Sequence, residues 1–263
     1  MIRTATRKDL PYLRELFARA NDAPYDLAAV AEEKCFAAGI AGKPVVRVID
    51  GKGAAVTCGK WLRVLIVERG SRGRGVGSEL LRDSNATVIA AEPGNYFTPG
   101  VPENLRGFFE RSGYIESAST WNLDCSTDFG AAGDVRRPAH EDRERVLAFV
   151  EREFGRIWRF EAAKAFEREI PPAFVSEENG ELTGFAVHDV NNRGLGWFGP
   201  TGVTKSMRGR GIGCRLLLAS LADLRRLGYP RAIIPWTDAL EFYRKCCGAE
   251  AAYRFFTMAR RDR

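Results

Sequence analysis

The chain repeats itself, and this internal repeat constrains its fold more than any other feature. Residues 72–77 read Arg-Gly-Arg-Gly-Val-Gly, and residues 208–213 read Arg-Gly-Arg-Gly-Ile-Gly. Nearer the start of each half, residues 2–9 are matched by residues 135–142, and in both segments an arginine precedes an aspartate by six positions. A match that keeps its order and nearly its offset indicates two homologous halves.

A third match lies near the end of each half. The aromatic pair Phe108 and Phe109 stands shortly before a glycine, as do Phe242 and Tyr243. A chain of 263 residues fits one large domain or two ordinary ones, and the repeat favours two. Apolar periodicity lapses in the glycine-containing stretch 127–133, which predicts an N-terminal domain over residues 1–128 and a C-terminal domain over residues 129–263.

Each half has the same predicted order of elements. An amphipathic helix stands near the start, strands follow, and the glycine-rich segment joins the last of these strands to a second amphipathic helix. The expected strands around this segment lie at 44–48, 54–58 and 62–67, and at 173–176, 184–190 and 195–203. A strand, a helix and a strand then close each half, at 88–91, 104–111 and 119–123, and at 232–235, 240–247 and 253–259.

The composition is that of a folded globular protein. Hydrophobic residues make up 45% and charged residues 28% of the chain, and no segment has the low hydrophobicity of a disordered tail. We find no uninterrupted apolar run of membrane-spanning length and no signal-peptide pattern, so we expect a cytoplasmic protein without a membrane partner. Six scattered cysteines and two histidines give no metal-ligand spacing, which predicts reduced thiols and no metal.

The net charge of +6 suits a polyanionic partner. Charge alone does not distinguish nucleic acid from a phosphate-rich small molecule such as coenzyme A. Because the sequence has no nucleic-acid recognition motif and no stripe of alternating basic and aromatic residues, nucleic-acid binding is the weaker hypothesis, and we expect none.

The glycine-rich segments have the features of an anion site. A glycine turn between a strand and a helix gathers unpaired backbone N–H groups at the positive end of the helix dipole. Glycines let the backbone approach a pyrophosphate closely, while Arg208 and Arg210 add positive charge. A surface turn with incidental arginines is the alternative, but two copies in the same context favour the anion site. The spacing is neither the dinucleotide fingerprint nor a Walker P-loop.

The segments after Val67 and Val203 resemble the Arg/Gln-x-x-Gly-x-Gly/Ala motif of GNAT acetyltransferases. This resemblance covers nearly the whole chain, twice. It implies an α/β (α+β) protein of two tandem GNAT folds, each with a mixed, mostly antiparallel central sheet flanked by helices, in an architecture that resembles mycothiol synthase. It also implies acetyl-CoA or coenzyme A as co-substrate, direct acetyl transfer to a small-molecule amine, and no metal.

The resemblance further implies roles for individual residues. A backbone N–H near Val203 would face the thioester oxygen, and Tyr243 would protonate the departing thiolate. An interior aromatic is the alternative role for Tyr243. Phe109 holds the matching place in the first half and has no proton to give, so we predict that the second half is catalytic and the first degenerate. The implied cofactor-binding residues are Val203, Thr204, Lys205, Arg208, Gly209, Arg210, Gly211, Ile212, Gly213 and Cys214, together with Val67, Arg72, Gly73, Gly75 and Gly77.

A general base for the amine is not evident from the sequence. The polar candidates near the expected site are of types that usually lie on the surface: His188, Asp189, Asp238 and Glu241. Trp158, Trp197 and Trp236 are expected to pack in the core or in a pocket wall, and of the adjacent Cys246 and Cys247 only one can face the core. The leading hypothesis is an N-acetyltransferase, and the alternative is a non-catalytic acyl-CoA-binding regulatory protein. Both a monomer and a homodimer remain possible.

Overall fold

The computed structural model describes residues 1–130 and 133–261. The chain divides into two compact units, one formed by Met1–Thr120 with Tyr253–Arg263 and the other by Trp121–Ala252. Residues 131 and 132, within the stretch 127–133 where the sequence predicts the domain boundary, lie outside the described residues. No helix in the described part of the chain is long and apolar enough to cross a bilayer.

The first sequence match forms the same turn in both units. In unit 1, the Arg3 guanidinium lies 2.8 Å from the Asp9 carboxylate, which also accepts a hydrogen bond from the Thr6 N–H at 2.7 Å. In unit 2, Arg136 lies 2.6 Å from Asp142, which accepts the Ala139 N–H at 3.0 Å. Hydrogen bonds from the Arg3 guanidinium and the Thr6 N–H lower the pKa of Asp9 to about 2. An ionised carboxylate therefore stabilises this turn.

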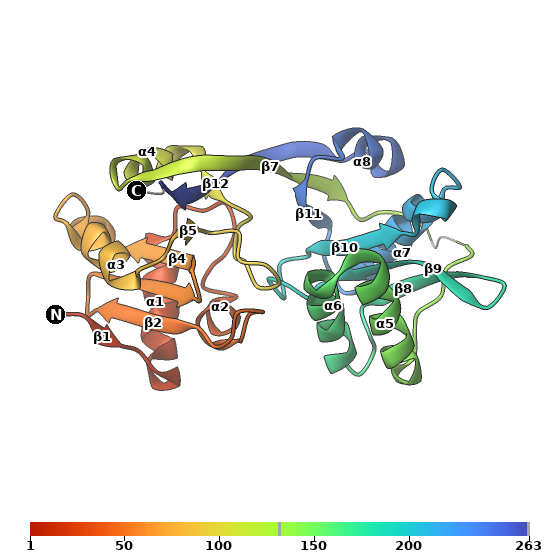
Figure 1. The fold of residues 1–263 in the computed structure, drawn as a ribbon, viewed down its shortest axis with the longest axis horizontal. Helices are drawn as coiled ribbons and strands as arrows, with labels where there is room; N and C mark the ends of the chain where they lie inside the picture. Colours follow the sequence, from red (N-terminus) through yellow and green to blue (C-terminus); the bar gives the residue numbers. More distant parts are fainter. Residues whose placement is uncertain (131–132, 262–263) are drawn as a thin grey trace. The chain divides into compact units, whose positions relative to one another are not determined.

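Unit 1 is a mixed sheet with helices on it (Figure 1). Its strands follow the order β1-β2-β3-β4-β5-β12-β7, and all described pairs are antiparallel except β4 with β5. The strands are β1 (Arg3–Thr4), β2 (Val45–Ile49), β3 (Gly53–Cys58), β4 (Trp61–Val67), β5 (Val88–Ile89), β6 (Val101–Pro102), β7 (Tyr114–Ser126) and β12 (Glu250–Arg260). The helices are α1 (Leu10–Ala20), α2 (Ala31–Phe36), α3 (Val76–Ser84) and α4 (Glu103–Arg111).

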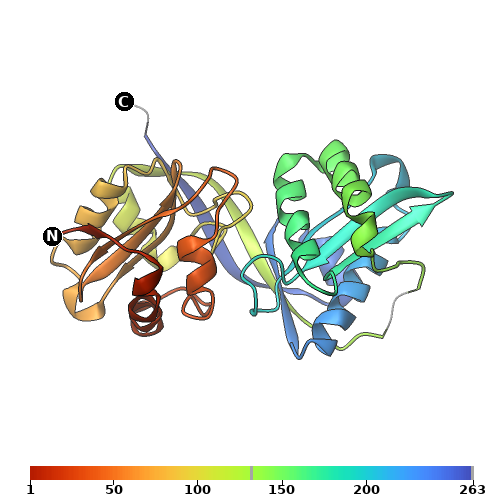
Figure 2. The ribbon, with the colours of Figure 1, turned by 90° about the horizontal axis from the view of Figure 1, so that it is seen from below.

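Unit 2 repeats this arrangement around a second sheet. The antiparallel strands β8 (Ala173–Glu178), β9 (Glu181–His188) and β10 (Phe198–Val203) lie in the order β10-β9-β8, and β11 (Arg231–Thr237) pairs with β7. Helices α5 (Arg143–Phe154) and α6 (Arg156–Ala163) cover one face of this sheet and α7 (Ile212–Arg226) covers the other (Figure 2). Helix α8 (Leu240–Cys247) follows β11. The predicted fold class, a mixed and mostly antiparallel sheet flanked by helices, is confirmed.

Each half of the chain contributes the later part of its last strand to the opposite unit. From β7, Leu123 and Cys125 pair with Ile234 and Ala232 of β11 and lie in the core of unit 2. From β12, Met258 pairs with β5 and lies in the core of unit 1. The compact units therefore differ from the division at residues 128 and 129 that the repeat predicts. Alternating apolar residues predict that such a segment is a strand, but they do not say which strand it pairs with.

Most predicted elements are present with shifted ends. The strand expected at 195–203 begins at Phe198, and the one expected at 119–123 extends over the whole of β7. The strand expected at 88–91 stops after Ile89, because Ala90 and Ala91 adopt left-handed backbone angles, with φ of 56° and 54°, that cannot continue a ladder.

Candidate functional site

Two loops of the same geometry join β4 to α3 and β10 to α7. Gly75 and Gly211 stand at the N-caps of these helices with φ of 84° and 74°, in the left-handed region that side-chain-bearing residues rarely adopt. Gly73 and Gly209 also have positive φ, of 72° and 80°. The glycine spacing noted in the sequence is therefore required by the backbone of both loops.

Both helices leave unpaired N–H groups directed out of their first turn. The first helical hydrogen bond runs from Glu79 to the Gly75 carbonyl in α3, and from Arg215 to the Gly211 carbonyl in α7. The N–H groups of the N-cap and of the first three helical residues thus have no partner within the helix. Together with the positive end of the helix dipole, they form a site suited to a phosphate group in each unit.

The third glycine of each loop gives room to a later helix. A Cβ atom added at Gly213 would lie 3.3 Å from the Phe242 ring, and one added at Gly77 would lie 3.3 Å from the Phe108 ring. Phe242 is on α8 and Phe108 is on α4, so each loop is packed against the helix that carries the aromatic pair. This packing brings Tyr243 and Phe109 to matching places.

The strand before each loop ends with a backbone N–H that points away from the antiparallel strand beside it. Thr204 donates to the Thr183 carbonyl at 2.9 Å, and Val203 lies opposite Gly184. Since hydrogen-bonded and non-bonded pairs alternate along an antiparallel ladder, the Val203 N–H points away from β9. Val67 has the same position, because Glu68 donates to the Lys52 carbonyl at 2.8 Å. This geometry is compatible with the oxyanion donor expected at Val203.

The arginines of the two loops add positive charge and also form hydrogen bonds and an ion pair with nearby groups. Arg208 Nε donates to the Val203 carbonyl at 3.2 Å, and Arg72 Nε donates to the Val67 carbonyl at 3.0 Å. Arg210 pairs with Glu178 through two contacts of 2.7 and 2.9 Å. The sequence predicts Arg208 and Arg210 only as positive charges beside a phosphate, and the structure adds these internal partners, of which the Glu178 carboxylate balances the charge of Arg210.

A cavity of about 480 Å³ lies beside the first loop, within unit 1. The end of β4, the first turn of α3 and the aromatic pair of α4 line it. One wall includes Arg63, whose guanidinium forms a buried ion pair with Glu92, with contacts of 2.5 and 2.8 Å. Sequence reasoning missed this pair because its partners lie in different elements and belong to no motif.

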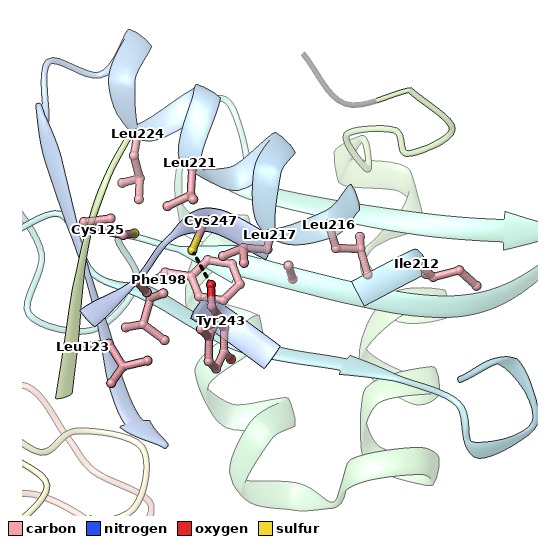
Figure 3. Close-up of a cluster of buried hydrophobic side chains, with 14 residues drawn as sticks. Leu123, Cys125, Phe198, Ile212, Leu216, Leu217, Leu221, Leu224, Tyr243 and Cys247 are labelled. Carbon is pink, nitrogen blue, oxygen red and sulfur yellow. Dashed lines mark hydrogen bonds between the residues drawn. The ribbon is translucent and has the colours of Figure 1, made fainter. Parts of the chain in front are cut away.

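Tyr243 lies in the main core of unit 2 (Figure 3). Its side chain is 8% exposed, and its ring packs edge-on against Phe198, with 6.3 Å between ring centroids, and against Phe242 at 4.9 Å. Burial, with the neighbouring Cys247 and Cys246, raises the pKa of the phenol. Tyr243 therefore remains a protonated group, as a general acid must, and it also packs as an interior aromatic. Phe109 packs in the same way against Phe108.

Two of the four polar candidates are not on the surface as expected. His188 is buried and contacts the Asp223 carboxylate at 2.8 Å, and burial lowers its pKa. Asp189 is also buried and accepts the Gly194 N–H at 2.8 Å. The surface expectation was wrong for both, because each has a partner inside the fold: Asp223 for His188, and Arg168 and the Gly194 N–H for Asp189. Asp238 and Glu241 are exposed.

Most of the tryptophans and cysteines considered in the sequence analysis pack as predicted, and Trp236 does not. Trp197 is buried and Trp158 stacks on Phe154 with 5.4 Å between ring centroids, whereas Trp236 is 40% exposed with a φ of 52°. Of the adjacent cysteines, Cys247 is buried and Cys246 is half-buried.

Comparison with known protein families finds a match in the second half of the chain. The model of the acetyltransferase (GNAT) family matches residues 138–249. Comparison with curated protein sequences gave no match.

Solved structures of the same fold cover nearly the whole chain. A GCN5-related N-acetyltransferase from Sphaerobacter thermophilus is 20% identical with a TM-score of 0.69, over 98% of this chain and 94% of its own. A tandem GNAT protein from the clavulanic acid biosynthesis pathway is 17% identical with a TM-score of 0.63, over 98% and 97%.

A third solved structure belongs to a much longer protein. It contains a GCN5-related glucosamine N-acetyltransferase region of a fungal multi-domain GH3 β-N-acetylglucosaminidase, and it is 17% identical with a TM-score of 0.76. The match covers 98% of this chain, which spans only 38% of that protein. Residues 138–249 thus match the acetyltransferase (GNAT) family in sequence, and the chain as a whole shares the fold of these solved structures.

Proposed function

We propose that this chain transfers an acetyl group from acetyl-CoA directly to a primary amine, at a site in unit 2. One observation carries the proposal. The first turn of α7, with its unpaired N–H groups, lies between a strand end whose Val203 N–H is turned outward and a helix that presents Tyr243. Acetyl transfer from acetyl-CoA uses these three groups: an anion site for the pyrophosphate, a donor for the thioester oxygen and an acid for the departing sulfur.

Each group has a stated part in the reaction. The N–H groups from Gly211 to Cys214 bind the pyrophosphate of coenzyme A, and the Val203 N–H stabilises negative charge that develops on the thioester oxygen. The neutral amine attacks the carbonyl carbon, the new C–N bond forms, and the C–S bond breaks. Tyr243 gives its proton to the departing sulfur, while the proton of the amine passes to solvent or to a base that we do not assign.

Binding the thioester and the amine at one site supplies much of the rate enhancement. Aminolysis of a thioester becomes an effectively unimolecular step when the amine is oriented against the carbonyl carbon. No residue of the described site requires a metal for this chemistry.

A second candidate role concerns unit 1 alone. Its cavity adjoins a complete glycine loop, while Phe109 stands where an acid would be required. This combination favours binding of acyl-CoA without turnover in unit 1, a structural or regulatory role for the first half of the chain. A chain that only binds acyl-CoA in both units is the non-catalytic alternative.

A thiol-release assay with acetyl-CoA and a panel of amines tests the proposal. Amino sugars belong in the panel, because one structural relative is described as a glucosamine N-acetyltransferase region. Small aliphatic amines and peptide N-termini complete it. Release of coenzyme A that depends on one acceptor, with the acetylated amine found by mass spectrometry, is the expected result. Tight binding of acetyl-CoA with no acceptor-dependent release would instead favour the non-catalytic alternative.

A further inference from the structure

Two thiols meet beside the proposed coenzyme A loop. Cys214 is in the first turn of α7, Cys246 is in the last turn of α8, and both are half-buried. Helices α7 and α8 pack against each other, and the neighbouring Cys214 thiol helps to raise the pKa of Cys246. Cys246 lies one helical turn beyond Phe242, whose ring packs at Gly213, so the packing of the two helices places Cys246 beside the turn that carries Cys214.

A second pair of thiols in unit 2 differs in accessibility. Cys125 and Cys247 also interact, but both are buried, and Cys247 donates to the Tyr243 backbone carbonyl at 3.2 Å. An oxidant from solvent reaches a half-buried thiol more readily than one enclosed in a core. Of the two pairs, Cys214 and Cys246 is the one in which both thiols have access to solvent.

The first half of the chain carries serines at the matching places. Ser78 follows Gly77 as Cys214 follows Gly213, and Ser112 follows the aromatic pair of α4 at the spacing of Cys246. In unit 1, the Ser112 hydroxyl donates to the Phe108 carbonyl at 2.9 Å. The same pair of helices therefore forms with hydroxyls, which indicates that the fold does not require thiols at these two positions.

We propose that Cys214 and Cys246 form a thiol–disulfide modification site, at which a low-molecular-mass disulfide closes a bond that weakens acyl-CoA binding in unit 2. The effect on binding rests on the proposed function, whereas formation of the bond does not.

The reaction proceeds by two thiol–disulfide exchanges. The Cys214 thiolate attacks a disulfide RSSR, forms a mixed disulfide and releases one RSH, which takes up the proton that Cys214 lost. Cys246 then loses its proton, attacks the Cys214 sulfur and releases the second RSH. Two protein thiols are oxidised by two electrons, and one RSSR is reduced to two RSH. Burial and the neighbouring Cys214 raise the pKa of Cys246 to about 12, so Cys214 is the first nucleophile.

The bond would disturb the anion site next to it. A disulfide holds its sulfur atoms about 2 Å apart, closer than two thiols in contact, so the last turn of α8 and the first turn of α7 must be drawn together. The Phe242 ring already packs closely at Gly213 and resists this approach. Since the unpaired N–H groups of α7 belong to the turn that moves, their alignment with a pyrophosphate is lost.

The test uses the full chain in glutathione buffers of increasing disulfide content. Peptide mapping after alkylation should find one intramolecular disulfide, between Cys214 and Cys246. Calorimetry should find acetyl-CoA affinity lowered about five- to tenfold in the oxidised chain, a usual size for coupling between two sites, and restored by dithiothreitol. Cys246→Ser should abolish both the disulfide and the redox dependence. Cys247→Ser is the matched control, because it changes the adjacent thiol and should leave both effects intact.

Distinct results overturn the proposal. They are a chain that stops at the mixed disulfide with glutathione, a bond between other cysteines, or a Cys214–Cys246 bond that leaves acetyl-CoA affinity unchanged. If the reduced chain does not bind acetyl-CoA at all, the proposed function fails, and the mapping still decides whether the bond forms.

Discussion

At the scale of single residues, Tyr243 and Phe109 differ by one hydroxyl in otherwise matching surroundings. Each ring packs against the aromatic residue before it, Phe242 at 4.9 Å and Phe108 at 5.0 Å between centroids, and each of those neighbours closes on the third glycine of its loop. Because the contact with the preceding aromatic residue is made by both rings, it does not depend on the hydroxyl, which leaves the hydroxyl a chemical role in unit 2. Replacing it tests chemistry with little change in the core.

We expect Tyr243→Phe to lower kcat about 10²-fold, near the lower end of general-acid effects, since a thiolate leaves fairly well without help. The affinity for acetyl-CoA should change little. Steady-state kinetics with the identified acceptor, together with calorimetry, separate the two quantities. Phe109→Tyr is the control, and it should add no activity because an acceptor site and a base are also needed. Unchanged kcat in Tyr243→Phe would remove the tyrosine from the mechanism.

The pH dependence of turnover gives an independent check on Tyr243. Burial raises the pKa of the phenol above its ordinary value of about 10, and a general acid acts in its protonated form. Activity that depends on this proton is therefore present below the raised pKa and lost only above it. We expect no loss of kcat from Tyr243 below pH ~10. A decline with a midpoint near pH ~8 that disappears in Tyr243→Phe would contradict the assignment.

The sequence predicts the site residues that belong to a motif. It does not predict side-chain partners or burial, which depend on contacts between distant parts of the chain. The glycines of both loops were recognisable, because only glycine suits their positive φ. The partners of Arg210 and the burial of His188 were not, since Glu178 and Asp223 come from distant parts of the chain. A residue type predicts its average environment, and a buried polar network departs from that average.

At the scale of elements, the loop before α7 should bind acetyl-CoA through its backbone. We expect Gly211→Val to abolish detectable binding in unit 2, because a β-branched residue is strained at a φ of 74° and its side chain obstructs approach to the N–H groups. Calorimetry on the full chain measures the effect. Gly211→Asn is the matched control, since asparagine tolerates the left-handed region and an added Cβ would meet only the flexible end of Arg215, at 3.2 Å.

Binding by this loop should also weaken as salt rises, because contacts between a phosphate and a positively charged site are screened. Affinity that is insensitive to salt, or a Gly211→Val chain that binds normally while its thermal unfolding is unchanged, would place the ligand elsewhere.

Strand identity was predictable from the sequence, but strand partnership was not. The segments around Leu123 and Met258 alternate as strands should, and both are strands. Each half contains a complete set of expected elements, so the sequence alone favours pairing within a half. The structure pairs each last strand with the opposite half. Hydrophobic alternation specifies the buried face of a strand and leaves its neighbour undetermined.

At the scale of the whole molecule, the two loops allow the roles of the units to be separated. Gly75→Val should leave turnover largely intact if unit 1 is not catalytic, while any acetyl-CoA bound in unit 1 is lost and the binding stoichiometry falls. Calorimetry and kinetics on one preparation measure both. A loss of turnover beyond what thermal unfolding explains would show that unit 1 takes part in catalysis, and activity that survives Tyr243→Phe but not Gly75→Val would move catalysis to unit 1.

The strand exchange predicts which fragment of the chain can fold. Unit 2 requires Trp121–Ser126 of β7, because Leu123 and Cys125 lie in its core and β11 otherwise has an unpaired edge. Burying a leucine side chain contributes roughly 1.5–3 kcal/mol. This is a large share of the roughly 5–15 kcal/mol that stabilises a domain, and the loss of the ladder adds to it. A chain of residues 121–252 should therefore unfold cooperatively in a thermal melt followed by circular dichroism, whereas residues 129–252 should show no such transition or a much lower Tm. Equal transitions in the two fragments would mean that β7 is dispensable to unit 2, and that the repeat boundary also divides the fold.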